Sequence, residues 1–167
     1  MKYIVFLTIF LLIGCNSCSI NKNQKQKVQK PEDVSGLTIK PLHGFENDTI
    51  KYLFTNVIQQ KKYFADKKLS FLIDNLEISV ENYLIGSNFN QPDSIPSITL
   101  LFTNMNSFFV NKKEKKYILL NIEWVKPVDK KSSVDLISKT KGRWTDEAYN
   151  FYKDRLVKDI TTVEQKP

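Results

Sequence analysis

The chain has 167 residues, of which 41% are hydrophobic and 26% are charged, and its formal net charge is +7. This size and composition are typical of one ordinary folded domain and exclude a wholly disordered chain. A single His and two Cys argue against most metal sites and most His-based catalytic centres.

The first residues have the pattern of an export signal. Lys2 is followed by an apolar-dominated stretch over residues 3–13, and small Gly14 then precedes Cys15. Eleven helical residues span about 16 Å, roughly half of the hydrocarbon core of a bilayer, so a permanent spanning helix is disfavoured. The pattern predicts a signal peptide over residues 1–14 that is removed after export.

Leu12, Ile13, Gly14 and Cys15 resemble the lipobox of bacterial lipoprotein precursors, in which a large aliphatic residue, a second apolar or small residue and Gly or Ala precede an invariant Cys. The resemblance implies cleavage before Cys15, a diacylglycerol on the Cys15 sulfur and acylation, for example with palmitate, of the new amino terminus. Cys18 lacks the preceding aliphatic residue and is a poorer acceptor. This covalent lipid is the only cofactor-like group that we expect. A plain secretory signal with a chance Cys is the alternative reading.

Several acyl chains hold a protein stably on a membrane, at about 0.8 kcal/mol for each buried methylene. We therefore expect the mature protein in the bacterial cell envelope. By the same resemblance, Asn16 stands where an Asp suggests inner-membrane retention in some bacteria, which favours the outer membrane facing the periplasm. This location argues against nucleic acid as a partner, despite the positive net charge.

Residues 15–45 are expected to form a flexible, lipid-anchored tether. Residues 16–36 are mostly Asn, Gln, Lys and Ser without an apolar period, so burial cannot offset the entropy of ordering them. Thirty flexible residues reach roughly 30 Å, enough to hold a small domain clear of the headgroups. Contact of the lysines with anionic lipid is the alternative to a solvated linker, for Lys22, Lys25, Lys27 and Lys30.

A single globular domain is expected over residues 46–165, and it begins with two amphipathic helices. The first has apolar residues at helical spacing, with Asn47 or Asp48 as its N-cap. The second is expected to be capped by Asp66, and the short connection predicts a helix hairpin. The two stripes are Ile50, Leu53, Phe54, Val57 and Ile58, and then Leu69, Leu72, Ile73 and Leu76.

The apolar period then changes to two, which predicts a three-stranded antiparallel meander with one buried face. Even-numbered positions must pair with even-numbered positions in the last two strands, which requires an odd-numbered loop around residues 111–113. The second strand is expected to run on towards Asn111. The inward positions are Ile78, Val80 and Leu84, then Ile98, Leu100 and Phe102, and finally Ile118, Leu120, Ile122 and Trp124.

Thr145, followed by Asp146 and Glu147, predicts the start of a last helix. Its apolar stripe is Ala148, Tyr152, Leu156, Ile160 and Val163. The sequence leaves the secondary structure of the stretch around Val134 open. Together these elements predict an α+β two-layer sandwich, with a helix hairpin, a three-stranded antiparallel meander and a C-terminal helix.

No catalytic constellation is visible, so we do not expect an enzyme. No spacing marks a nucleophile or a carboxylate as the partner of His43. Two carboxylate pairs are explained as charges at helix starts, namely Glu46 with Asp48 and Asp146 with Glu147. An acid pair that acts on glycan stays open, because the separation of two carboxylates is a property of the fold.

Several exposed residues are candidate partner contacts. Phe89 is an aromatic residue in an otherwise polar loop. Tyr149 belongs to an aromatic group with Trp144, Phe151 and Tyr152, for which core packing is favoured over a sugar or peptide platform. A basic cluster at the predicted hairpin tip is either a solvated turn or a contact for an acidic partner, and it comprises Lys112, Lys113, Lys115 and Lys116.

These observations favour a lipid-anchored, non-enzymatic protein-binding or scaffolding module with a protein partner in the envelope. An inhibitor or immunity lipoprotein that blocks a hydrolase or toxin is the second hypothesis. A carboxylate-dependent envelope glycan hydrolase is the third. The sequence defines neither the partner nor the oligomeric state.

Overall fold

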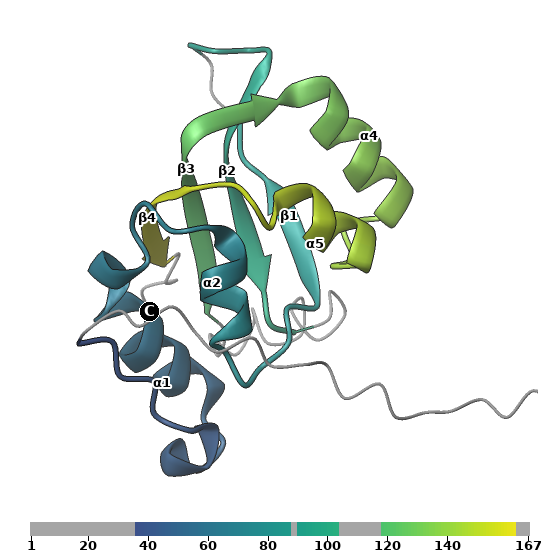
Figure 1. The fold of residues 1–167 in the computed structure, drawn as a ribbon. Coiled ribbons are helices and arrows are strands. Elements are labelled where there is room, and N and C mark those ends of the chain that lie inside the picture. The colour runs from purple at the N-terminus through teal and green to yellow at the C-terminus, as the bar shows by residue number, and fades with distance from the viewer. Residues whose placement is uncertain (1–35, 88–89, 104–117, 163–167) are drawn as a thin grey trace, which may run out of the picture. The chain divides into compact units, whose positions relative to one another are not determined.

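The computed structural model describes residues 36–87, 90–103 and 118–162. They belong to one compact unit of mixed α+β structure (Figure 1). Its antiparallel sheet has the strand order β1-β2-β3-β4. The strands are β1 (Asn82–Ile85), β2 (Ser94–Leu101), β3 (Leu119–Asp129) and β4 (Val157–Thr162).

The helical segments of the described residues form the second layer. They are η1 (Leu42–Phe45), α1 (Thr49–Leu53), the π-helical turn η2 (Phe54–Ile58), η3 (Lys61–Tyr63), α2 (Leu69–Asp74), α4 (Lys130–Thr140) and α5 (Asp146–Tyr152). Figure 1 shows α2 and α5 lying across the front of the sheet. Their buried side chains join one cluster with those of the strands, so the predicted α+β class and two-layer arrangement are confirmed.

The register predicted for the second and third strands is also confirmed. Ile98 pairs with Ile122 and Leu100 pairs with Leu120, so even positions oppose even positions. The register shifts between Ile95 and Ser97, and Pro96, which has no N–H to donate to the ladder, lies at this irregularity. The loop around residues 111–113 and the extension towards Asn111 lie outside the described residues.

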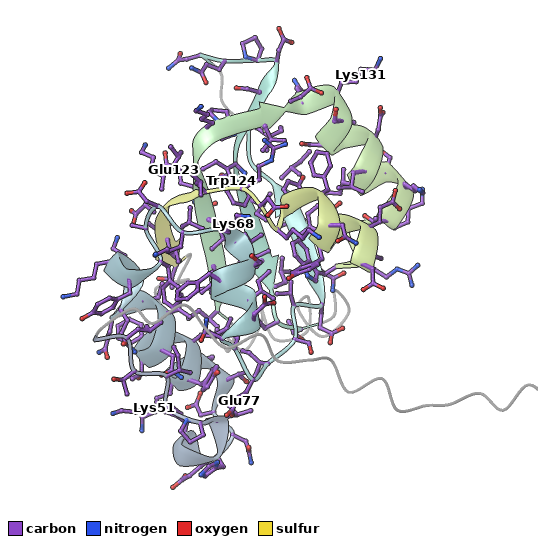
Figure 2. The ribbon with its side chains drawn as sticks, viewed as in Figure 1. Lys51, Lys68, Glu77, Glu123, Trp124 and Lys131 are labelled. Atoms are coloured by element: carbon purple, nitrogen blue, oxygen red, sulfur yellow. The ribbon has the colours of Figure 1, made fainter. Side chains whose placement is uncertain are left out.

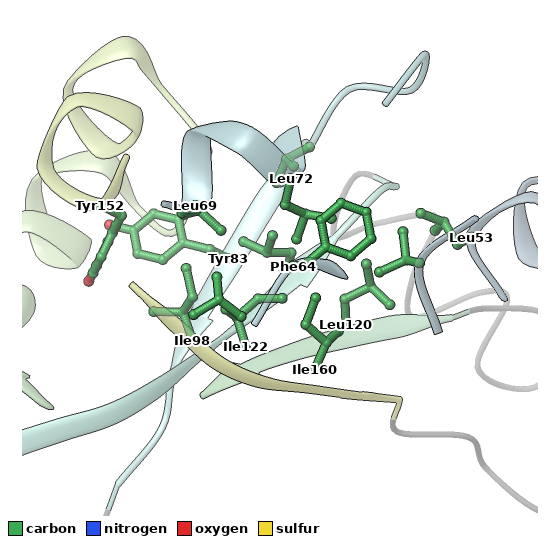
Figure 3. Packing of buried hydrophobic residues seen from close by; sticks show 14 of the residues in the cluster. Leu53, Phe64, Leu69, Leu72, Tyr83, Ile98, Leu120, Ile122, Tyr152 and Ile160 are labelled. Atoms are coloured by element: carbon green, nitrogen blue, oxygen red, sulfur yellow. The ribbon is translucent and has the colours of Figure 1, made fainter. Parts of the chain in front are cut away.

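The core lies between the helices and one face of the sheet (Figure 3). Its central residues are completely buried, and those that Figure 3 labels are Leu53, Phe64, Leu69, Leu72, Tyr83, Ile98, Leu120, Ile122, Tyr152 and Ile160. They come from the helices and from all four strands of the described sheet. The helices are therefore held by apolar contact with a single sheet face.

The first helix begins as predicted, because the Asp48 side chain accepts a hydrogen bond from the Lys51 N–H (3.0 Å). Leu53 and Val57 are buried, but Ile50 and Phe54 are exposed. The helix widens into η2, where each turn takes more residues, so a strict 3.6-residue stripe does not stay on one face.

The predicted cap of the second helix is wrong. Asp66 has a left-handed backbone, and Lys68 precedes α2 without a side-chain cap. Backbone bonds fix this connection instead. Asp66 N–H donates to Val157 O (2.7 Å) and Leu69 N–H donates to Arg155 O (2.9 Å).

The predicted inward face of the first strand is also wrong. Tyr83 is completely buried, whereas Leu84 is exposed. The strand begins only at Asn82, and Tyr83 pairs with Leu100, whose side chain faces the core. Paired residues share a face, so Tyr83 must point inward.

The last helix is shorter than predicted, since α5 ends at Tyr152 and is followed by β4. Ile160 is buried as a strand residue paired with Ile122, while Leu156 is exposed. The β-branched residues of β4 favour a strand. Val163 lies outside the described residues.

The ambiguous stretch around Val134 forms α4. The Asp129 carboxylate caps this helix by accepting from Ser132 N–H (2.8 Å). The folded body also begins earlier than residue 46, because Leu42–Phe45 form η1 and Phe45 is buried. Residues 36–41 of the expected tether are described as well, and Leu37 and Ile39 pack against the core, so the tether is shorter than predicted at this end. Residues 15–35 lie outside the described residues.

Replacing a residue on the core face of β3 should cost far more stability than replacing one on the opposite face. We expect Ile122→Ala to lower the free energy of unfolding by about 2–5 kcal/mol, because it leaves a cavity in the core. The matched Val125→Ala change on the same strand should cost no more than about 1 kcal/mol. Chemical denaturation of both variants measures the difference, and equal losses would contradict the described burial.

Candidate functional site

Most of the candidate contact residues lie outside the described residues. These are the lipidation residue Cys15, the loop residue Phe89 and the basic cluster of Lys112, Lys113, Lys115 and Lys116. Tyr149 is the candidate contact that the structure describes. The site is therefore built from the surfaces of the described body.

The Tyr149 hydroxyl is already engaged within the body. It donates to Asp74 Oδ1 (3.1 Å) and so links α5 to α2. Burial and the Asp74 carboxylate raise the pKa of Tyr149 to about 12. The Lys153 ammonium lies 6.0 Å from the centre of the ring. These contacts give the side chain a structural role between two helices.

The aromatic group at the last helix is centred on Tyr152, as core packing predicts. Its ring is stacked between Trp124 (5.9 Å between centroids) and Trp144 (6.2 Å). Phe151 and Tyr83 meet it edge-on, at 4.7 and 5.8 Å. Tyr152 is completely buried, so the centre of this group is not a surface platform.

Two polar atoms in this aromatic group are buried without a hydrogen-bond partner among the described residues, namely Trp124 Nε1 and the Tyr152 hydroxyl. Burial raises the pKa of Tyr152 to about 12, and nearby Ser133 opposes this only in part. The Ser133 hydroxyl donates elsewhere, to Asp129 O (2.9 Å). The Tyr83 hydroxyl, by contrast, shares a hydrogen bond with Thr140 Oγ1 (3.1 Å).

Tyr152→Phe and Tyr83→Phe should therefore differ at neutral pH. Tyr152→Phe removes an unpaired hydroxyl, so we expect a free energy of unfolding equal to or above that of the wild type. Tyr83→Phe leaves the Thr140 hydroxyl unpaired in a buried position and should cost about 1 kcal/mol. Urea denaturation compares the two, and a larger loss for Tyr152→Phe would contradict this account.

The same hydroxyl should give a signature at alkaline pH. Between pH 10 and about 12 the unfolded chain ionises at position 152 while the folded chain keeps its proton, so stability falls as pH rises. A shift of this size corresponds to roughly 2–3 kcal/mol. Tyr152→Phe should lose less stability than the wild type over this range, and parallel curves for both proteins would contradict the expectation.

Asp48, Asp146 and Glu147 lie at helix starts, as the sequence indicates, whereas Glu46 ends η1 as its C-cap. Asp48 caps α1, and Glu147 forms an exposed ion pair with Lys139 (2.6 Å). Glu46 and Asp48 are exposed and line a depression of about 300 Å³ next to η1.

His43 is exposed in η1. The described residues contain no group of three or more His, Cys, Asp or Glu that could hold a metal.

Charge is nearly balanced over the described body. It contains 15 Lys and Arg and 14 Asp and Glu, so six of the seven net positive charges lie elsewhere in the chain. Charged residues are spread over the body, since Lys51 and Glu77 lie at the α1 end and Lys131 lies at the opposite end (Figure 2). The described body thus has no strong net charge that would attract an oppositely charged partner.

The sheet face opposite the core carries no described helix, and we call it the open face. A polar row crosses three of its strands. Thr99 Oγ1 donates to Asn121 Oδ1 (3.3 Å), and Asn121 Nδ2 donates to Thr161 Oγ1 (3.5 Å). Three further residues of the same face, Asn82, Leu101 and Leu119, are buried at one end of it and do not belong to its accessible part. The described residues that form the accessible part of the open face are Leu84, Ser97, Thr99, Asn121, Glu123, Val125, Asp159 and Thr161.

Ion pairs and aliphatic side chains flank the polar row. Glu123 accepts from Lys158 (3.0 Å), and Asp159 accepts from Lys61 (2.8 Å), which lowers the pKa of Asp159. Leu84 and Val125 are exposed large aliphatic residues. The open face therefore combines fixed hydrogen-bonding groups with apolar surface on rigid strands.

The sequence contained part of the signal for this surface. The predicted parity already places Thr99 and Asn121 on the outward face, because both are odd-numbered, and the observed register sets them opposite each other. Thr161 gave no such signal, since its segment was expected to be helical. The outward orientation of Leu84 was missed because the parity of the first strand was wrong.

Comparisons with protein families, with curated proteins and with solved structures find no match to this chain. Within the described ranges, no helix has the length and apolar character needed to cross a membrane.

Proposed function

We propose that this protein is a lipid-anchored lipoprotein of the bacterial cell envelope that binds another envelope protein without catalysing a reaction. The amino-terminal pattern that ends at Cys15 supports the anchor, and Asn16 favours the outer membrane facing the periplasm. The segment between Cys15 and the folded body acts as the tether. The folded body supplies the binding surface.

The observation that carries the binding role is the open face. The helical residues of the core cluster pack on the other side of the sheet, so the polar row, Leu84 and Val125 are offered on paired strands that are already ordered. A preformed surface loses little conformational entropy when a partner binds. The polar row gives directional hydrogen bonds, while Leu84 and Val125 give apolar contact.

The anchor is tested by growing the producing bacterium with labelled palmitate. We expect label on the wild-type protein and on Cys18→Ser, because Cys18 is not the acceptor. Cys15→Ser should lose the label and leave the membrane fraction. Label that persists on Cys15→Ser, or its absence from the wild type, would refute the anchor.

The binding surface is tested by photo-crosslinking in intact cells. A photoreactive p-benzoylphenylalanine in place of Leu84 should crosslink one defined envelope protein. The matched control position is Val134 on the outer side of α4, because both side chains are 38% exposed. The same product from both positions, or a product from position 134 alone, would contradict binding through the open face.

A further inference from the structure

An extended segment of the chain is held on η2 by two side-chain amides, away from the open face. The Lys40 N–H donates to Asn56 Oδ1 (2.9 Å), and Asn56 Nδ2 donates back to Lys40 O (2.8 Å). The Thr38 N–H donates to Gln60 Oε1 (3.0 Å), and Gln60 Nε2 donates back to Thr38 O (2.6 Å). Each amide therefore pairs with both backbone groups of one residue, as a neighbouring strand does.

The two amides hold alternate residues of the segment. Asn56 lies in the π-helical turn η2 and Gln60 follows this turn, and they pair with Lys40 and Thr38, which lie two residues apart. Two residues of an extended backbone advance about 6.6 Å. The contacts involve only backbone atoms of the segment, so they select an extended conformation and not particular side chains.

Side-chain burial supports the same arrangement. Leu37 and Ile39 are half-buried and pack against the core cluster, while the alternating residues Thr38 and Lys40 are exposed. Asn56 is a completely buried polar residue. A buried amide is costly unless it is paired, so the Lys40 backbone is a necessary partner for it.

The ends of the segment are fixed by different contacts. The Leu42 N–H donates to Glu77 Oε2 (2.6 Å). At the other end Gly36 lies against Tyr63, and a Cβ added to Gly36 would stand 2.7 Å from the Tyr63 hydroxyl oxygen. Gly36 also has a φ of 104°, a conformation that favours glycine.

We propose that Asn56 and Gln60 form a backbone-binding site, here called the latch, whose occupant is the chain's own residues 37–41. The latch determines where the N-terminal segment leaves the folded body. The hydrogen bonds given above for Thr38 and Lys40 run to side chains, so the latch opens without breaking the sheet ladder. This is the kind of local opening that costs less than global unfolding.

The consequence of opening rests on the proposed lipid anchor. Release of residues 37–41 adds five residues to the tether, or at most about 17 Å of reach at extended spacing. The folded body then explores a larger volume around its anchoring point. The latch itself is defined by contacts within the body and holds whether or not Cys15 is acylated.

Amide hydrogen exchange tests the latch on the mature chain with Cys15→Ser, which separates the result from the fate of the anchor. In Gln60→Ala the Thr38 amide should exchange at least tenfold faster, and in Asn56→Ala the Lys40 amide should do so. The core amides of Leu120 and Ile122 should keep their rates. Gln59→Ala is the matched control, since Gln59 is exposed one residue from Gln60.

Gln60 lies nearer the surface than Asn56, so its variant keeps the test informative if Asn56→Ala unfolds the body. An unchanged Thr38 rate in Gln60→Ala would overturn the proposal. Equal acceleration at Thr38 and Leu120 would overturn it as well, because the segment would then open only with the whole body. Loss of Thr38 protection on dilution would show that the site is filled by a second copy, which also contradicts the proposal.

Discussion

The even-to-even pairing of β2 with β3 is the constraint on which the remaining structure depends. Leu100 against Leu120 and Ile98 against Ile122 place large aliphatic side chains on one side of the sheet. Because strand side chains alternate, a slip of one residue would turn all of them to the other side. The helices therefore have one apolar face to pack against, and the polar row of Thr99, Asn121 and Thr161 follows on the opposite side.

The sequence predicts the features that have a strong local or periodic cause. Asp48 and Thr145 begin helices as expected, since each side chain accepts from a backbone N–H of the first turn. The parity of the β2–β3 pairing follows from alternation alone. The fourth strand was missed because Ala148, Tyr152, Leu156 and Ile160 also fit a helical repeat, and pairing with the free edge of β3 decides between the two structures.

The candidate site is less predictable for a related reason. Asn56 and Gln60 act on backbone atoms some twenty residues away, and nothing in the sequence of residues 37–40 identifies their partners. Tyr149 is half-buried, and its bond to Asp74 depends on the packing of two helices, which the sequence does not encode locally. The anchor motif and the basic cluster are readable in the sequence, and their residues lie outside the described ranges.

The position of β4 has a consequence for the order in which the body is completed. β3 pairs with β2 on one side and with β4 on the other, and β4 is formed by the last described residues, Val157–Thr162. Until that stretch emerges during synthesis, the backbone groups along one edge of β3 have no partner within the sheet. Such an edge invites pairing between nascent chains. On the export route proposed above, chaperones that keep the polypeptide unfolded would protect this edge during this interval.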